Sequence, residues 1–126
     1  METEGAASFA AAHKHGQPTP LPAITSIATS LGALCVTQGT LDTTIETVPM
    51  QVTDREAVQA CLRYADEERI LVEPACGASL AAIYDAERLQ TITDNLGENK
   101  LVVVVVCGGN VVSLELLEKW RTEFAC

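Results

Sequence analysis

The strongest indication of the fold in this sequence is residues 101–113, which read LVVVVVCGGNVVS. Valine is branched at Cβ and favours extended backbone, so residues 101–107 predict a β-strand. The run is apolar at both parities, which is typical of a strand buried on both faces of a parallel sheet. Two glycines then allow a tight turn, and Ser113 can cap a helix that begins at Leu114. Because ligands bind at the carboxyl ends of parallel strands, we expect Cys107 to lie where a ligand meets the sheet.

Acidic side chains outnumber basic ones, with 17 Asp and Glu against 8 Lys and Arg and a net charge of -9. This balance disfavours binding to nucleic acid and docking on anionic membranes, so neither partner is expected. The chain of 126 residues is at most one domain. Its valine run is far too short to cross a bilayer.

The five cysteines form no Cys-x-x-Cys pair. Their odd number and the lack of a recognisable signal sequence favour the reducing cytoplasm over secretion. His13 and His15 are not spaced against a cysteine pair, so no structural zinc site is expected. Both histidines are expected in an exposed loop over residues 13–22, which is rich in proline and glycine.

Two helices are predicted in the middle of the chain. Thr53 followed by Glu56 forms a capping box, and the apolar residues after it recur at helical spacing as far as an acidic end at residues 66–69. Pro74 suits a first helical position and predicts a second helix of small residues that ends at Tyr84. Weaker patterns predict a helix over 24–31, extended runs over 33–37 and 70–72, irregular chain over 38–50 and a polar turn over 94–99.

Three segments carry the pattern of one enzyme family. Residues 70–78, ILVEPACGA, resemble the EP-[AS]-x-G-A element of fold type II pyridoxal-phosphate (PLP) enzymes, and residues 104–110, VVVCGGN, resemble their [SC]-G-G-N element. Residues 2–9, ETEGAASF, resemble a third element, E-T-x-G-A-x-S-F, and residues 21–28 resemble the helix that follows it. A cysteine in the second element most resembles the L-serine dehydratase, or L-serine ammonia-lyase, family, whereas relatives that act on threonine more often carry serine there.

The resemblance implies an α/β fold, namely a partial three-layer parallel sheet with helices on both faces. In the family, the Schiff-base lysine lies in an N-terminal Ser-x-Lys segment, and a phosphate-binding glycine loop precedes the element that residues 2–9 match. This sequence contains neither feature, and Lys14, Lys100 and Lys119 lie in different contexts. We therefore expect residues 1–126 to form the C-terminal portion of the large PLP-binding domain, without the lysine-bearing segment and the small domain.

The resemblance also implies roles for four cofactor-binding residues. Cys107 would face the pyridine nitrogen of PLP, Gly108 and Gly109 would shape the pocket floor, and Glu73 would line the pocket near the ring. A neutral thiol does not hold that nitrogen protonated as a carboxylate would, which suits β-elimination of water. From the residues alone, a buried thiol that ends a strand, an ordinary glycine turn and a surface carboxylate remain open as alternatives.

A second set of matching positions concerns a metal ion. Glu2, Ala6, Ser8 and the carbonyl of Leu31 match positions that hold a monovalent cation, such as potassium, in the family. Oxygen donors suit a hard cation of this kind. The alternative interpretation is a solvated acidic N-terminus.

The function implied is that of an L-serine ammonia-lyase, which acts on serine or threonine and gives pyruvate and ammonia from serine. Without the lysine, this chain should be inactive alone, and a full-length relative is expected to be a cytoplasmic homodimer. The alternative is a non-catalytic truncated paralogue that acts as an interaction or regulatory subunit, because a partial parallel sheet exposes unpaired edges. A small nucleotide-binding module is disfavoured, because G-x-G-x-x-G and a P-loop lysine are both missing from the sequence.

Overall fold

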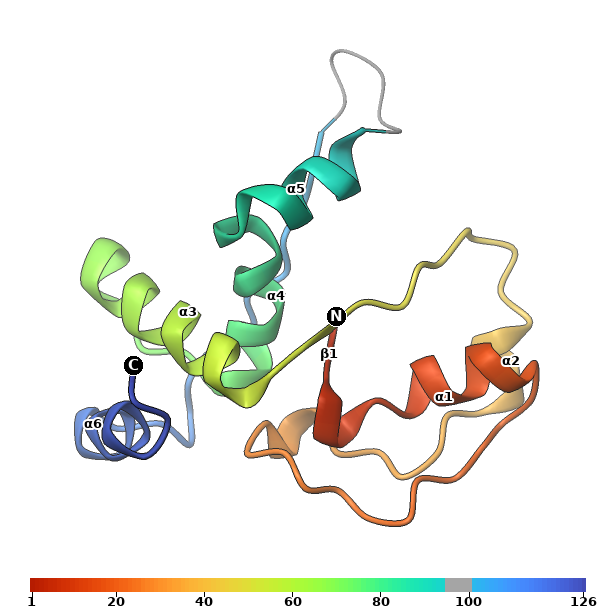
Figure 1. Cartoon of the computed structure of the whole chain (residues 1–126), viewed down its shortest axis with the longest axis horizontal. Helices are drawn as coiled ribbons and strands as arrows, with labels where there is room; N and C mark the ends of the chain where they lie inside the picture. Colours follow the sequence, from red (N-terminus) through yellow and green to blue (C-terminus); the bar gives the residue numbers. More distant parts are fainter. Residues whose placement is uncertain (95–100) are drawn as a thin grey trace.

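The computed structural model describes residues 1–94 and 101–126, which combine helices with a small parallel sheet (Figure 1). In chain order the elements are β1 (Glu2–Thr3), η1 (Glu4–Ala6), α1 (Ser8–His15), η2 (Thr29–Leu31), α2 (Gln38–Leu41), β2 (Gln51–Val52), α3 (Asp54–Glu68), α4 (Pro74–Tyr84), α5 (Ala86–Thr93) and α6 (Leu114–Glu123). Within the described residues, no helix combines the length and the apolar character that a membrane span needs.

The sheet consists of β1 and β2, which pair in parallel with Thr3 opposite Val52. The long connection between them carries α1, η2 and α2, so the unit is a parallel crossover rather than a hairpin. Both Thr3 and Val52 are buried, and α4 packs against the two strands. The sheet therefore joins the N-terminal segment to the helical core.

Helices α3 and α4 form that core, and their ends follow the sequence signals. The Thr53 hydroxyl accepts from the N–H of Glu56, whose carboxylate accepts in turn from the N–H of Thr53, so the predicted capping box is confirmed. Pro74 begins α4 as predicted. A Cβ on Gly77 would lie 2.2 Å from the carbonyl oxygen of Ala57, so the two helices approach closely because one of them carries glycine at this point.

The valine run does not form the predicted strand. Residues 101–107 carry no strand pairing, and the side chains of Leu101, Val103 and Val105 are 86%, 73% and 67% exposed. The prediction of a strand buried on both faces is therefore wrong for this chain. The reason is that a strand needs neighbours for its backbone groups, and in the described residues β1 and β2 pair only with each other.

Other short elements also differ from the sequence prediction. Residues 24–31 are helical only over Thr29–Leu31, and neither 33–37 nor 70–72 forms a strand. The stretch expected to be irregular contains α2. Most of these runs are only a few residues long, so local propensity alone does not decide their conformation. The polar turn predicted over 94–99 lies, apart from its first residue, outside the described residues.

The two histidines lie in a helix rather than in a loop. Helix α1 includes His13 and His15 in its last turn, and both side chains are exposed. The helix ends at Gly16, whose φ of +68° is a usual helix-terminating conformation. The predicted loop therefore begins at Gly16, after the histidines.

Candidate functional site

The first turn of α4 is bonded to the glycine turn that follows the valine run. The carbonyl oxygen of Gly108 accepts from the N–H of Glu73 across 3.1 Å and from the thiol of Cys76 across 3.4 Å. The N–H of Gly108 donates to the Cys76 sulfur across 3.5 Å. The first N–H groups of a helix have no hydrogen-bond partner inside the helix. The carbonyl oxygen of Gly108 therefore supplies an acceptor that the start of α4 needs.

The structure explains why both positions 108 and 109 of this turn are glycine. Gly108 has a φ of +147°, which side-chain-bearing residues rarely adopt. A Cβ on Gly109 would lie 2.2 Å from the carbonyl oxygen of Leu71, so Gly109 is required by close approach of two backbones. The Gly-Gly pair therefore brings the end of the valine run against the segment that leads into α4.

An open cleft of about 450 Å³ lies at this junction, which is within the ~300–1,000 Å³ range of small-molecule sites. Its walls come from η2, from the start of α4 and from the glycine turn, and consist of Ser30, Leu31, Glu73, Ala75, Cys76, Ser79, Val105, Cys107, Gly108, Gly109 and Asn110. All four residues predicted to bind a cofactor line it. Cys107 is exposed, so the alternative of a buried thiol ending a strand is wrong for this residue.

The carboxylate in the cleft wall is held from the opposite side. The hydroxyl of Ser30 donates to Oε2 of Glu73 across 2.5 Å and so bridges η2 and α4. Sequence reasoning missed Ser30, as well as the contribution of Cys76 and Ser79 to the wall. No local pattern links Ser30 to Glu73, because the two lie far apart in the chain, whereas Cys76 lies within a recognised motif and could have been included.

The residues predicted to hold a cation lie around the start of α1 and in η2. The two carboxylate oxygens of Glu2 accept from the N–H groups of Phe9 and Ala10, at 2.8 and 2.9 Å, so Glu2 caps α1 rather than forming a solvated acidic end. Ala6 and Ser8 are buried. The carbonyl oxygen of Leu31 accepts from the N–H of Ala33 across 2.8 Å, and Leu31 lines the cleft. Among the described residues, no cluster of three or more His, Cys, Asp or Glu side chains is suited to a metal ion.

Comparison with known proteins decides the family. The family model for pyridoxal-phosphate dependent enzymes matches residues 1–108. This chain belongs to that family. A mouse protein named serine dehydratase-like is 48% identical over 130 residues, which cover 100% of this chain and 40% of the relative. The mouse L-serine dehydratase/L-threonine deaminase is 44% identical over 133 residues, which cover 98% of this chain and 39% of the relative.

A solved structure is similar over almost the whole chain. The crystal structure of a fungal L-serine ammonia-lyase from Rhizomucor miehei matches with a TM-score of 0.87 and 31% identity, covering 97% of this chain and 39% of that one. The α/β class and the fold type II assignment predicted from the sequence are therefore confirmed. The chain spans about 40% of the length of the curated relatives that it matches.

The cleft fits one end of the family's cofactor. A thiol, a carboxylate and a glycine floor suit the ring of PLP, and a Cβ built on Gly108 would have no other atom within 4 Å, so the floor is open above this glycine. Neither lysine nor arginine is among the described residues that line the cleft. The donors therefore fit the aromatic ring, whereas the wall formed by this chain offers no cationic side chain to a phosphate group.

Proposed function

We propose that this chain forms part of a PLP-dependent L-serine ammonia-lyase, which converts L-serine to pyruvate and ammonia and takes L-threonine as an alternative substrate. One observation carries the proposal: Cys107, Gly108, Gly109 and Glu73, which come from two separate sequence motifs, line one cleft. The names of the relatives, which include L-serine dehydratase/L-threonine deaminase, support the same reaction.

When bound, PLP supplies an electron sink for the carbanion that forms when a proton leaves the α-carbon of an amino acid. In the proposed enzyme, Cys107 offers a neutral thiol to the ring nitrogen, and the two glycines leave room for the ring. Ser30 holds Glu73 in the cleft wall through its 2.5 Å hydrogen bond, which restricts the carboxylate to one side of the site. These residues would orient the ring, whereas no lysine that could take up the α-proton is among the described residues of the cleft wall.

The second part of the proposal concerns the chain by itself. A lysine that binds the cofactor and removes the α-proton accounts for much of the rate in such chemistry. Because no lysine is among the described residues of the cleft wall, we propose that the 126-residue chain does not turn over serine alone. A longer polypeptide or a partner subunit would supply the base.

We also propose that the proposed enzyme binds a monovalent cation such as potassium through Glu2, Ala6, Ser8 and Leu31. The carboxylate of Glu2 keeps free acceptor capacity, since each of its oxygens accepts one backbone N–H of α1. Thermal unfolding of the chain in potassium, sodium and tetramethylammonium chloride tests this idea. Selective stabilisation by potassium that is lost in Glu2→Gln is expected, and equal melting in all three salts would contradict the cation site.

The function is tested by comparing the chain with a chimera. The chimera joins this chain to the lysine-bearing N-terminal part of the mouse serine dehydratase-like relative, and pyruvate is measured after addition of PLP and L-serine. The chain alone should give no sustained pyruvate, whereas the chimera should. A control chimera without the Schiff-base lysine should be inactive. Turnover by the chain alone at about 1 s⁻¹ or faster, which is typical of enzymes, would overturn the second part of the proposal.

The same chimera also tests the activity itself. A chimera that folds, binds PLP and forms no keto acid from either serine or threonine would contradict the proposed reaction. Replacing Cys107 by alanine in the chimera should lower the affinity for PLP without unfolding the protein. A titration followed by PLP absorbance measures this change.

One observation favours a second candidate, a non-catalytic interaction or regulatory subunit. The exposed side chains of Leu101, Val103 and Val105 form an apolar surface that a neighbouring strand could cover. Size-exclusion chromatography with light scattering tests this candidate. A chain that remains monomeric at high concentration, and does not associate with the full-length relative, would contradict it.

A further inference from the structure

Two cysteines share the wall of the cleft. Cys107 is exposed at the glycine turn, and Cys76 lies in the first turn of α4 with 5% of its surface accessible. Both are free thiols in the structure. No function derived above uses the Cys76 thiol beyond its hydrogen bonds to Gly108.

The hydrogen bonds of Cys76 place its sulfur close to Cys107. The sulfur lies 3.5 Å from the nitrogen of Gly108, which is bonded directly to the carbonyl carbon of Cys107. Standard backbone dimensions put the Cα of Cys107 about 2.4 Å from that nitrogen, so this Cα lies within roughly 6 Å of the Cys76 sulfur. A disulfide needs Cα atoms about 4.4–6.8 Å apart. Forming the disulfide therefore requires the Cys107 side chain to rotate toward Cys76 and the glycine turn to adjust until the two sulfurs are about 2.05 Å apart.

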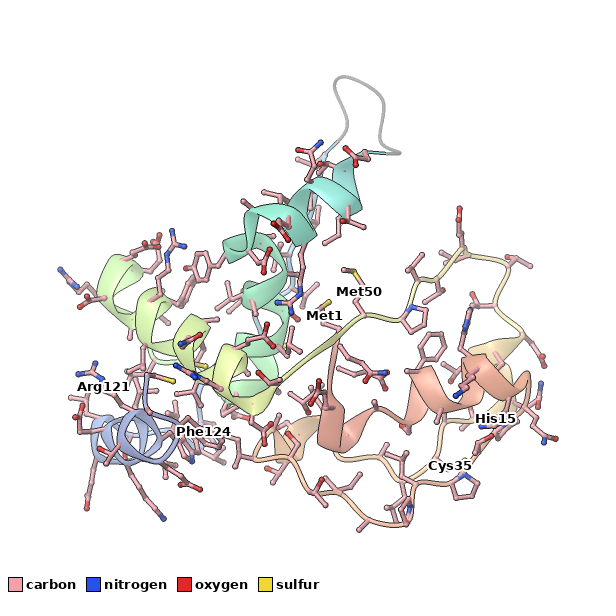
Figure 2. All side chains as sticks on the ribbon, in the orientation of Figure 1. Met1, His15, Cys35, Met50, Arg121 and Phe124 are labelled. Carbon is pink, nitrogen blue, oxygen red and sulfur yellow. The ribbon has the colours of Figure 1, made fainter. Side chains whose placement is uncertain are left out.

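The other cysteines are poorer partners for either thiol. Burial, and secondly the neighbouring Cys76, raise the pKa of Cys61 to about 12, so the reactive thiolate of Cys61 is scarce near neutral pH. Cys35 lies on the α1 and α2 side of the molecule, away from α4 (Figure 2). The sulfur of Cys126 lies 3.7 Å from the carbonyl oxygen of Arg55, at the start of α3. Cys107 is therefore the exposed thiol beside Cys76, whereas Cys61 is buried.

We propose that Cys76 and Cys107 are an oxidative modification site, at which a peroxide drives formation of a disulfide within the wall of the cleft. The Cys107 thiolate attacks one peroxide oxygen, so that an S–O bond forms, the O–O bond breaks and a water molecule leaves after taking up a proton. The Cys76 thiolate then attacks the Cys107 sulfur, the S–S bond forms, and the S–O bond breaks. The departing hydroxide takes up the proton that Cys76 released on forming its thiolate, so two thiols and one hydrogen peroxide give one disulfide and two waters.

The disulfide would change the site in two ways. It consumes the exposed thiol of the cleft wall, and it removes the thiol proton through which Cys76 bonds the carbonyl oxygen of Gly108. The inference does not depend on the proposed activity, because it needs only the two thiols and an oxidant. It does add a means of regulation to the proposed enzyme, since oxidation consumes the thiol that would face the ring of PLP.

Peptide mapping tests the proposal directly. Trypsin cleaves after lysine and arginine, and this places each of the five cysteines on a different peptide, with Cys76 on residues 70–88 and Cys107 on residues 101–119. The full chain is reduced, freed of reductant, treated with hydrogen peroxide, blocked with N-ethylmaleimide and digested without reductant. The expected product is a 70–88/101–119 pair that is lighter by two hydrogens than the sum of its reduced peptides.

Three variants give the experiment its controls. Cys76→Ser and Cys107→Ser should each lose the linked pair, and in Cys76→Ser the oxidised Cys107 should be trapped by dimedone as a sulfenic acid. Cys35→Ser removes an exposed thiol elsewhere and should leave the yield of the linked pair unchanged. If circular dichroism shows that either cleft variant does not fold, the wild-type chain is oxidised in urea instead. In urea the chain is unfolded, so the preference for the 76–107 pair should be lost.

Two outcomes would overturn the proposal. One is a dominant disulfide between Cys76 and Cys61, and the other is stable sulfenic acid at Cys107 in the wild-type chain without the linked pair. A parallel arm with PLP present separates this inference from the proposed function. Protection from cross-linking supports binding of PLP in the cleft, whereas equal cross-linking with and without PLP counts against that binding and leaves the disulfide established.

Discussion

The N–H of Glu73 donates to the carbonyl oxygen of Gly108 across 3.1 Å, and so joins the beginning of α4 to the end of the valine run. The two residues belong to different sequence motifs that lie far apart in the chain. Because both atoms belong to the backbone, side-chain substitution does not remove this bond. The cleft therefore depends on the conformations that allow the two backbones to meet, which makes the glycines the sensitive positions.

The first prediction is that Gly109→Ala destabilises the chain. The new Cβ would lie 2.2 Å from the carbonyl oxygen of Leu71, and a backbone atom cannot move aside as the end of a flexible side chain can. We expect a loss of about 1–3 kcal/mol, as for other overpacked sites. Urea unfolding followed by circular dichroism measures the change.

Gly39→Ala is the matched control, because a Cβ at this position in α2 meets no atom closer than 3.9 Å. Replacing a helical glycine at a compatible position stabilises proteins by about 0.4–1 kcal/mol. The two substitutions should therefore shift the urea midpoint in opposite directions. Equal midpoints would show that the approach of the turn to Leu71 is not tight.

The second prediction concerns the contact between α3 and α4. In Gly77→Ala the Cβ would meet the carbonyl oxygen of Ala57 at 2.2 Å and the sulfur of Cys61 at 2.6 Å, so the helices must move apart. Because these helices form the core, we expect a loss of about 2–3 kcal/mol, toward the upper end of the usual overpacking range. Near-ultraviolet circular dichroism and urea unfolding measure the effect. Unchanged stability would mean that the two helices can separate at little cost.

The sequence predicted the local features well, for a physical reason. The capping box at Thr53, the start of α4 at Pro74 and the cap of α6 all depend on residues within one helical turn, and the Ser113 hydroxyl accepts from the N–H of Leu116 across 3.1 Å. Such signals need no distant partner.

Features that depend on distant partners were predicted less well. Six apolar residues from Leu101 have the composition of a buried strand, yet they are largely exposed because no neighbouring strand of the described chain pairs with them. The bond between Ser30 and Glu73 could not be predicted, since neither residue carries a pattern that refers to the other. Cys107, Gly108, Gly109 and Glu73 could be named from the sequence because they lie in motifs that a family resemblance identified, and all four line the cleft.

The third prediction concerns the pH dependence of stability through Glu56. Burial raises the pKa of Glu56, but hydrogen bonds from the backbone of Thr53 and from Arg88 outweigh it, so that the pKa lies below its usual value. A pKa that is lower in the folded state stabilises the protein at pH values above the pKa of the same group in the unfolded chain, about 4.3. This stabilisation is lost as the pH falls through the pKa of the folded state. Glu56→Gln should therefore cost about 0.5–1 kcal/mol at pH 7, with the difference from wild type decreasing as the pH falls below about 4.3.

The choice of glutamine isolates the charge of Glu56, because glutamine can still complete a capping box with Thr53. Glu67→Gln is the control, since its ion pair with Arg63 is about half exposed and should contribute little. Unfolding in urea at pH 3, 5 and 7 provides the comparison. A deficit for Glu56→Gln that stays the same at pH 3 would show that packing, rather than charge, is responsible.

The fourth prediction is that Cys61 resists alkylation in the folded chain. Burial raises its pKa to about 12, so at pH 8 roughly one molecule in ten thousand carries the thiolate, and the thiol also donates to the carbonyl oxygen of Glu73 across 3.4 Å. Iodoacetamide should label the exposed Cys35 and Cys107 first, and the peptide containing Cys61 only after urea is added. Mass spectrometry over time measures the rates. If Cys61 were labelled without urea at the rate of Cys35, the contact between α3 and α4 would have to open readily. That result would also contradict the large loss of stability expected for Gly77→Ala.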